Sequence, residues 1–98
     1  MTINKNKNAD KLTISIEGRL DTSTAPDLEK EIKTSLEGIT ELTFDFSALE
    51  YISSAGLRVL LTAQKQMTKQ GSMTVTGSSD DILEIFEVTG FSDILTIK

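Results

Sequence analysis

Several short stretches of the chain alternate apolar and polar residues, which is the pattern of a β-strand with one covered face. The clearest are Leu12 to Glu17, with the sequence LTISIE, and Glu41 to Phe46, with the sequence ELTFDF. Weaker copies occur at Met73 to Thr76 and Ile94 to Ile97, and Thr2 to Asn4 is a candidate for a further edge strand. The pattern therefore predicts a sheet of four to five strands.

The same alternation predicts which side chains enter the core. The apolar positions of the three best strands share one face of the sheet: Leu12, Ile14, Ile16, Leu42, Phe44, Phe46, Met73 and Val75. The polar positions share the opposite face: Thr13, Ser15, Glu17, Thr43, Asp45, Thr74 and Thr76. Because only one face is apolar, we expect helices to cover the sheet mainly on that side.

Three segments between the strands have the apolar spacing of amphipathic helices. The first runs from Ala25 to Leu36 and stops at Gly38, the second from about Ser54 to Gln70, and the third from about Asp80 to Val88. Strands and helices thus alternate, which is typical of a small two-layer α/β fold. A length of 98 residues fits one domain. We therefore expect residues 1–98 to form a single domain, with a mixed sheet of four to five strands and helices packed mainly on one face.

The second predicted helix has one apolar stripe and one residue outside it. The stripe consists of residues at helical spacing: Leu57, Leu60, Leu61, Gln64 and Met67. Val59 lies off this stripe, and we expect its side chain to be free to meet a partner. No other apolar face is left over, so we expect the chain to be a monomer.

The residue content excludes several classes of chemistry. The chain has no cysteine and no histidine, so it lacks the side chains for thiol nucleophiles, iron–sulfur clusters, the usual zinc sites and serine–histidine–acid triads. No acid–base pair or cofactor motif is visible either. We expect no enzymatic activity, no cofactor and no metal site.

The charge and hydropathy of the chain restrict its partners and its location. Lysine and arginine number 10 against 15 acidic residues, and the formal net charge of −5 repels nucleic acid phosphates and anionic lipid. No apolar stretch reaches the ~20 residues that cross a membrane, and the polar start lacks the apolar segment of a secretory signal. We expect a cytoplasmic protein with no direct nucleic acid partner and no membrane attachment.

Two polar junctions between a strand and the following helix are candidate sites. One contains Ser53 and Ser54, and the other contains Asp21. A helix N-terminus presents free N–H groups, so a serine there either caps the helix or carries a phosphate comfortably. Residue chemistry alone favours capping for the serines and for Asp21. If the preceding strands are parallel, both junctions lie at the same end of the sheet.

Three short motifs follow one another along the chain. They are Gly-x-Leu-Asp-Thr at Gly18 to Thr22, an aliphatic residue with Ser-Ser-x-Gly-Leu at Ile52 to Leu57, and Phe-x-x-x-Gly-Phe at Phe86 to Phe91. Together, and in this order, they resemble the STAS domains of bacterial anti-sigma factor antagonists. The resemblance extends over residues 11–98 and implies the STAS fold.

The resemblance implies a protein that switches partners. The unphosphorylated form would bind an anti-sigma factor of the serine-kinase type and so free a sigma factor. Phosphorylation by that kinase would end the binding, and a phosphoserine phosphatase would restore it. The common family motif is Asp-Ser-Ser-Gly-Leu-Gly, with the phosphate on the serine before the glycine. Here that position holds Ala55, so the resemblance makes Ser54 the expected acceptor and Ser53 the second choice.

A partner-binding surface at the two junctions is also expected. It comprises Asp21, Thr22, Ser53, Ser54, Gly56 and Arg58. A second interpretation remains open, in which the chain is a constitutive, non-phosphorylated STAS subunit of a transport or sensing complex. Ala55 favours this alternative, whereas the two serines and Asp21 favour the phosphorylated switch.

Overall fold

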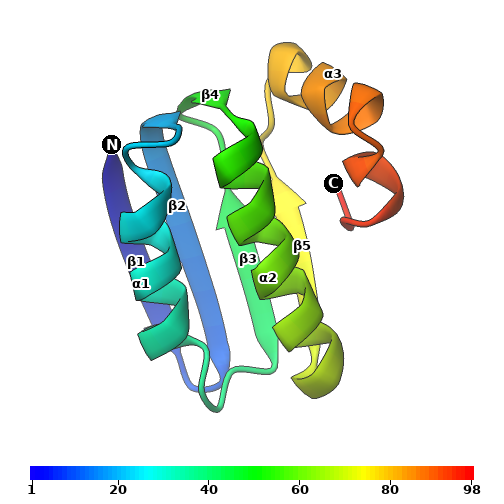
Figure 1. The fold of residues 1–98 in the computed structure, drawn as a ribbon. Helices are drawn as coiled ribbons and strands as arrows, with labels where there is room; N and C mark the ends of the chain where they lie inside the picture. Colours follow the sequence, from blue (N-terminus) through cyan, green and yellow to red (C-terminus); the bar gives the residue numbers. More distant parts are fainter.

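Five strands, three α-helices and one short 3-10 helix make up the computed structural model, which describes residues 1–98 (Figure 1). The strands are β1 (Thr2–Asn8), β2 (Lys11–Leu20), β3 (Glu41–Asp45), β4 (Leu49–Ile52) and β5 (Ser72–Thr76). The helices are α1 (Ala25–Ser35), α2 (Ser54–Gln70), α3 (Asp80–Val88) and the 3-10 helix η1 (Phe91–Asp93). The predicted small α/β fold is confirmed.

All five strands belong to one mixed sheet, in which β2 has the most neighbours. The order is β1-β2-β3-β5, with β1 antiparallel to β2 and the other pairs parallel. Residues 11–15 of β2 pair with β3, whereas residues 18–20 pair with β4, again in parallel. The register shifts beside Gly18, whose φ of +93° lies where side chains other than glycine are strained. The change of pairing partner from β3 to β4 therefore occurs at a glycine, which adopts this backbone conformation without strain.

The strands agree with the prediction except at four places. β2 continues to Leu20, three residues past its predicted end at Glu17, because residues 18–20 pair with β4. β1 continues to Asn8, past the predicted end at Asn4, because residues 2–8 all pair with residues 11–17 of β2. The strand β4 was not predicted. The segment 94–97 does not form the expected strand, because η1 precedes it and only Ile97 makes a β-bridge, to Val75.

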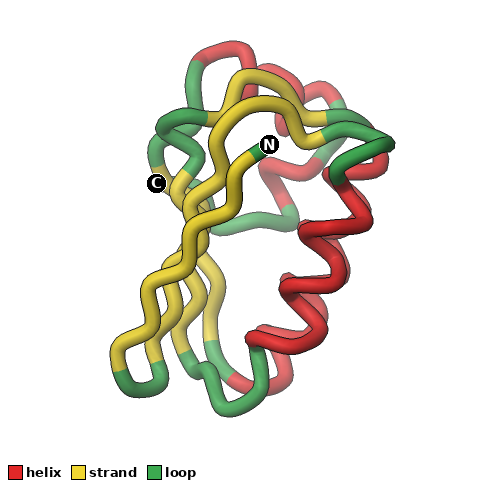
Figure 2. Tube along the Cα trace, turned by 90° about the vertical axis from the view of Figure 1, so that its left-hand side faces the viewer, coloured by secondary structure: helices red, strands yellow, loops and turns green.

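Both long helices pack on the same face of the sheet, and the opposite face is bare (Figure 2). All eight strand residues predicted for the core are buried, and they belong to one apolar cluster of 24 residues. The residues on the bare face are polar and partly exposed, with Thr13, Thr43 and Thr74 side by side in register on β2, β3 and β5. The one-sided cover predicted from the alternation is confirmed.

The prediction for Val59 is wrong. Its side chain is only 5% exposed and belongs to the core, together with Ala63 on the same helix. The reason is that α2 packs against α1 as well as against the sheet, so its buried arc is wider than one stripe. Leu61, which was placed on the stripe, is instead partly exposed.

The two edges of the sheet differ. The edge of β5 is covered by the C-terminal residues, since Val75 N donates to Thr96 O at 2.8 Å and Lys98 N donates to Val75 O at 2.9 Å. The outer edge of β1 pairs with no other strand and carries Lys5 and Lys7. Charged residues on a free edge oppose its pairing with another chain.

Candidate functional site

The two polar junctions lie at the same end of the sheet, as predicted from a parallel arrangement. Leu20, the last residue of β2, is paired with Ile52, the last residue of β4. The amide of Ser53 donates to the carbonyl oxygen of Leu20 at 2.9 Å, which holds the second junction against the first. The β2–α1 turn, β4 and the start of α2 accordingly meet at the upper end of Figure 1.

Asp21 organises the turn between β2 and α1. Its Oδ1 accepts hydrogen bonds from the amide and the hydroxyl of Ser23, at 3.0 and 2.8 Å, and from the amide of Thr24 at 3.2 Å. The Ser23 hydroxyl is the main cause that holds the pKa of this carboxyl below its ordinary value. Asp21 is therefore a turn-capping residue, whatever else it contacts, and Thr22 beside it is exposed.

A cation–π contact that the sequence did not predict lies next to Asp21. The guanidinium carbon of Arg19 lies 4.3 Å from the centre of the Tyr51 ring, and its Nε lies 3.8 Å from Oδ2 of Asp21. Both side chains are reachable from solvent. Arg19 and Tyr51 face each other because they are paired on β2 and β4. The sequence carried no signal for this contact, since β4 itself was not predicted.

The two serines have different environments at the start of α2. Ser53 is the N-cap residue, yet its side chain accepts no capping hydrogen bond, and its Oγ is inaccessible to solvent and has no hydrogen-bond partner. Ser54 is the first residue of the helix and is exposed. The prediction that the Ser53 side chain caps the helix is therefore wrong. Of the two serines, Ser54 is the exposed one.

Gly56 allows α2 to approach the strand ends closely. A Cβ at this position would lie 2.7 Å from Cγ of Leu20 and 2.8 Å from Cγ1 of Ile52, well inside ordinary carbon–carbon contact. The buried glycine thus contributes space rather than a contact surface. It brings the first turn of α2, with Ser54, next to the Asp21 turn.

Arg58 stands between two shallow grooves on the helical side of the molecule. One groove, of about 200 Å³, lies between α1 and α2 and is lined by Thr22 and Glu29 among others. The second, of about 290 Å³, lies between α2 and the α3–η1 region and is lined by Ser54 and Phe91 among others. Three of the six predicted partner-binding residues, Thr22, Ser54 and Arg58, line these grooves. Asp21 and Ser53 line neither groove, and Gly56 is buried.

The fold and this pair of junctions define a STAS domain. The family model described as STAS domain matches residues 2–98, and the chain belongs to that family. The resemblance predicted from the three motifs is therefore confirmed. No helix in the structure has the length and apolar content needed to cross a membrane.

Two proteins similar to this chain are named anti-sigma factor antagonists. The chain is 35% identical over 97 residues to the anti-sigma-B factor antagonist of Listeria monocytogenes, an alignment that covers 96% of this chain and 84% of that protein. An anti-sigma factor antagonist from Mycobacterium paratuberculosis has the same fold, with a TM-score of 0.88, 24% identity, and coverage of 98% of this chain and 83% of that one.

The fold also matches SpoIIAA from Bacillus, which has been solved in two forms. The unphosphorylated form aligns with a TM-score of 0.78 at 16% identity, over 99% of this chain and 87% of that one. The phosphorylated form aligns with a TM-score of 0.77 at 16% identity, over 99% and 91% of the two chains. The two scores differ little, so the fold of the present chain matches both forms.

Proposed function

We propose that the protein is an anti-sigma factor antagonist. In this function it binds an anti-sigma factor of the serine-kinase type while unphosphorylated, and thereby releases a sigma factor. The observation that carries the proposal is the 35% identity to the Listeria antagonist over nearly the whole chain. The protein acts by occupying a surface of its partner, and the chemistry of phosphate transfer belongs to the kinase.

Ser54 is the proposed acceptor because its residue is exposed, whereas the hydroxyl of Ser53 is not accessible. The γ-phosphoryl group of ATP would pass to Oγ of Ser54, the hydroxyl proton would go to a base of the kinase, and ADP would leave. A phosphoserine phosphatase would hydrolyse the ester with water and release inorganic phosphate. The cycle needs no cofactor from this chain.

The position of Ser54 explains how phosphorylation would act without unfolding the domain. A phosphate adds about −1.5 to −2 charges, and the positive end of α2 together with its free N–H groups favours that charge. The same charge faces outward, where a partner would dock, close to the carboxylate of Asp21. Phosphorylation would therefore weaken partner binding by repulsion and crowding while the folded state stays intact.

The experiment is reconstitution with the serine-kinase-type anti-sigma factor of the same organism. Wild-type protein should bind it, and after incubation with ATP and Mg²⁺ the peptide from Tyr51 to Arg58 should carry one phosphate on Ser54 by mass spectrometry. Ser54→Asp should weaken binding at least about tenfold, or ~1.4 kcal/mol. Ser54→Ala should bind but accept no phosphate, and the matched control Ser53→Ala should both bind and be phosphorylated. Absence of binding by the wild type contradicts the proposal.

The alternative is a constitutive STAS subunit that binds its partners without phosphorylation. The residue that favours it is Ala55, which occupies the position of the family's serine and is partly buried against the core. The same mass spectrometry decides between the two. Phosphate on neither serine, with partner binding intact, supports the constitutive subunit, whereas phosphate on Ser53 corrects the acceptor and keeps the switch.

A further inference from the structure

The helix α2 is basic in an acidic protein. Its 17 residues include three cations and no carboxylate, while the whole chain has a formal net charge of −5. The neighbouring helix α3 has the opposite character, with four acidic residues and no basic one. Charge is therefore segregated between these two helices.

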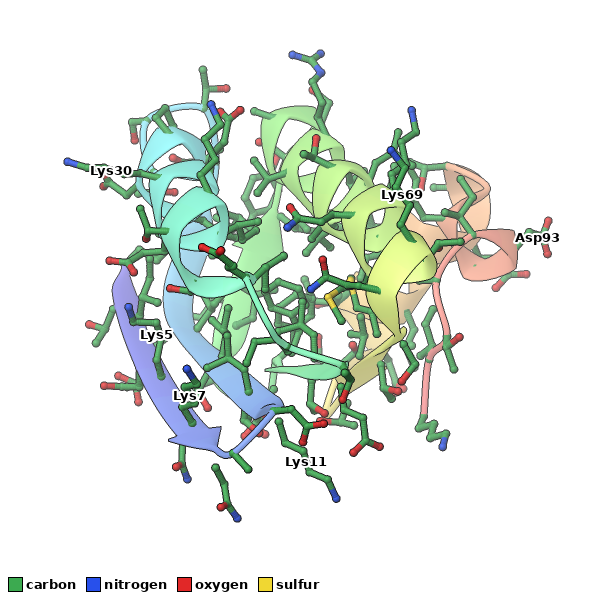
Figure 3. All side chains as sticks on the ribbon, turned by 90° about the horizontal axis from the view of Figure 1, so that it is seen from below. Lys5, Lys7, Lys11, Lys30, Lys69 and Asp93 are labelled. Carbon is green, nitrogen blue, oxygen red and sulfur yellow. The ribbon has the colours of Figure 1, made fainter.

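The three cations of α2 lie in one line along the helix. Arg58, Lys65 and Lys69 are spaced by seven and four residues, which returns to nearly the same side of a helix with ~3.6 residues per turn. The opposite side of α2 is the buried one, with Gly56, Leu60, Ala63 and Met67. Figure 3 shows Lys69 projecting from α2 on the side away from the sheet. We call Arg58, Lys65 and Lys69 the cationic stripe.

The cationic stripe has no carboxylate partner within the molecule. All three side chains belong to exposed residues. The four ion pairs of the structure involve other cations, namely Lys5, Lys11, Arg19 and Lys33. Three aligned positive charges thus remain available to an outside group of opposite sign.

An apolar groove runs along one side of the cationic stripe. It is the groove of about 290 Å³ between α2 and the α3–η1 region, lined by Ser54, Leu57, Arg58, Leu61, Thr89 and Phe91. Leu61 and Phe91 are both partly exposed there. Val88, the residue before Thr89, is 76% exposed, the most exposed large apolar side chain of the protein. Apolar surface of this kind beside charge is typical of a protein-binding site.

We propose that the cationic stripe and this groove together form the docking surface for an acidic segment of the anti-sigma factor. An apolar side chain of the segment fills the groove, and its carboxylates pair with Arg58 and Lys65. Charge complementarity favours this occupant, because Arg58 is the one charged residue that lines the groove and none of the acidic residues of α3 lines it. The inference rests on the proposed function and specifies which chemistry of the partner is recognised.

The surface also connects docking to the proposed phosphorylation. Ser54 lines the groove and precedes Arg58 by four residues, which is one helical turn. A phosphate on Ser54 would pair with the guanidinium of Arg58 and stand at the rim of the groove. Phosphorylation would thereby remove a cation from the partner's carboxylates and narrow the space for its apolar side chain.

The test compares two charge reversals of equal size on the full-length protein. Arg58→Glu/Lys65→Glu should weaken binding of the anti-sigma factor at least ~10-fold at low salt, mainly through slower association. The matched control is Lys7→Glu/Lys30→Glu, which changes the net charge equally at two exposed lysines away from α2. The control should change the affinity less than ~3-fold. Equal weakening by both variants would show a general effect of net charge and would overturn the proposal.

The apolar part of the surface is tested separately. Leu61→Gln should accelerate dissociation of the complex, whereas Thr34→Gln, an exposed position on α1, should leave dissociation unchanged. A photo-crosslinking residue at Thr62 should capture an acidic segment of the anti-sigma factor; capture of a basic or uncharged segment contradicts the proposal. Circular dichroism of each variant checks that the fold is retained.

The outcomes distinguish this surface from the proposed function. A complex that Ser54→Asp disrupts but that tolerates charge reversal on α2 contradicts the surface alone. A wild-type protein that binds no anti-sigma factor contradicts the proposed function, and the surface with it. Crosslinking of Thr62 to α3 of a second copy, with concentration-dependent sedimentation, would show that the surface serves self-association and would also overturn the proposal.

Discussion

The backbone amide of Ser53 donates to the carbonyl oxygen of Leu20 at 2.9 Å, and this one bond joins the two loops of the site. Because it is a main-chain bond, it does not depend on which side chains the loops carry. The Asp21 turn and the start of α2 are thus held at fixed positions by the backbone. Exposed residues such as Thr22 and Ser54 are free to vary in charge or carry a modification without loss of this arrangement.

Replacement of Gly56 should destabilise the domain. The Cβ of Gly56→Ala would collide with Leu20 and Ile52, at 2.7 and 2.8 Å, so the first turn of α2 must move or the core must repack. We expect a loss of about 1–3 kcal/mol in the free energy of unfolding, measured by urea denaturation. Thr62→Ala, on the exposed side of the same helix, should change it by less than about 0.5 kcal/mol. A Gly56→Ala variant as stable as wild type would contradict the close approach.

Two N-cap serines should respond differently to alanine. Ser79 Oγ accepts a hydrogen bond from the amide of Ile82 at 3.3 Å, so Ser79→Ala should cost about 1 kcal/mol of unfolding free energy. Ser53 Oγ accepts none and is buried, so Ser53→Ala should leave stability unchanged or slightly raised. Thermal unfolding of the two variants side by side checks this, and an equal loss in both would show that Ser53 caps α2 in solution.

Stability should fall in acid partly through Asp21. Hydrogen bonds, first that from the Ser23 hydroxyl, lower the pKa of this carboxyl in the folded state. The ionised form therefore stabilises the fold at pH above the unfolded value of about 4, and this contribution is lost as the pH falls through the folded pKa. Asp21→Asn keeps an acceptor oxygen but cannot titrate, so its unfolding free energy should decline less between pH 5 and 2.

Ser23→Ala provides the second arm of this experiment. Without the hydroxyl donor, the pKa of Asp21 should rise toward its ordinary value, and the acid dependence of unfolding should again become shallower. Both variants are compared with wild type by urea denaturation at several pH values. If the unfolding free energies of all three proteins fell equally between pH 5 and 2, Asp21 would not contribute to the pH dependence.

Val59 should matter for stability and not for partner binding. Its side chain is 5% exposed within the core, so Val59→Ala should lower the free energy of unfolding by about 2 kcal/mol through lost burial and a small cavity. The affinity of the folded variant for the anti-sigma factor should equal that of wild type by titration calorimetry. Reduced affinity at unchanged stability would place Val59 on the binding surface after all.

The lysines of β1 should keep the protein monomeric. Lys5 and Lys7 pair with Ile14 and Leu12, two core residues of β2. The two lysine side chains therefore lie on the helix-covered face of the sheet, at its free edge. Pairing of β1 with a second copy would bring these charges together. Wild-type protein should sediment as a monomer at micromolar concentration, whereas Lys5→Val/Lys7→Val should form dimers. A stable wild-type dimer contradicts this account.

The apolar periodicity predicted the elements that are covered on one face only. The alternation of residues 12–17 and 41–46, and the helical spacing of 80–88, each reflect one covered face, and the structure confirms them. The common position of the two junctions also followed, because parallel strands end at the same edge of a sheet. These features depend on local pattern and on general topology.

The apolar periodicity did not predict features that depend on contacts with more than one neighbouring element. β4 escaped prediction because its buried ends, Leu49 and Ile52, flank two exposed residues and do not alternate. Val59 was misplaced because α2 is buried by α1 as well as by the sheet. The contact of Arg19 with Tyr51 and the missing cap of Ser53 depend on where whole elements sit, which no short stretch of sequence records.

The divided pairing of β2 has a consequence for how such proteins diversify. Residues 11–15 belong to the four-stranded part of the sheet, while residues 18–20 pair with β4 and lead into the Asp21 turn. Substitutions in the two junctions fall at one end of the sheet and leave the four-stranded part untouched. Sequence change in the two junctions is thereby compatible with a constant fold, because the pairing that defines the sheet lies elsewhere on the same strand.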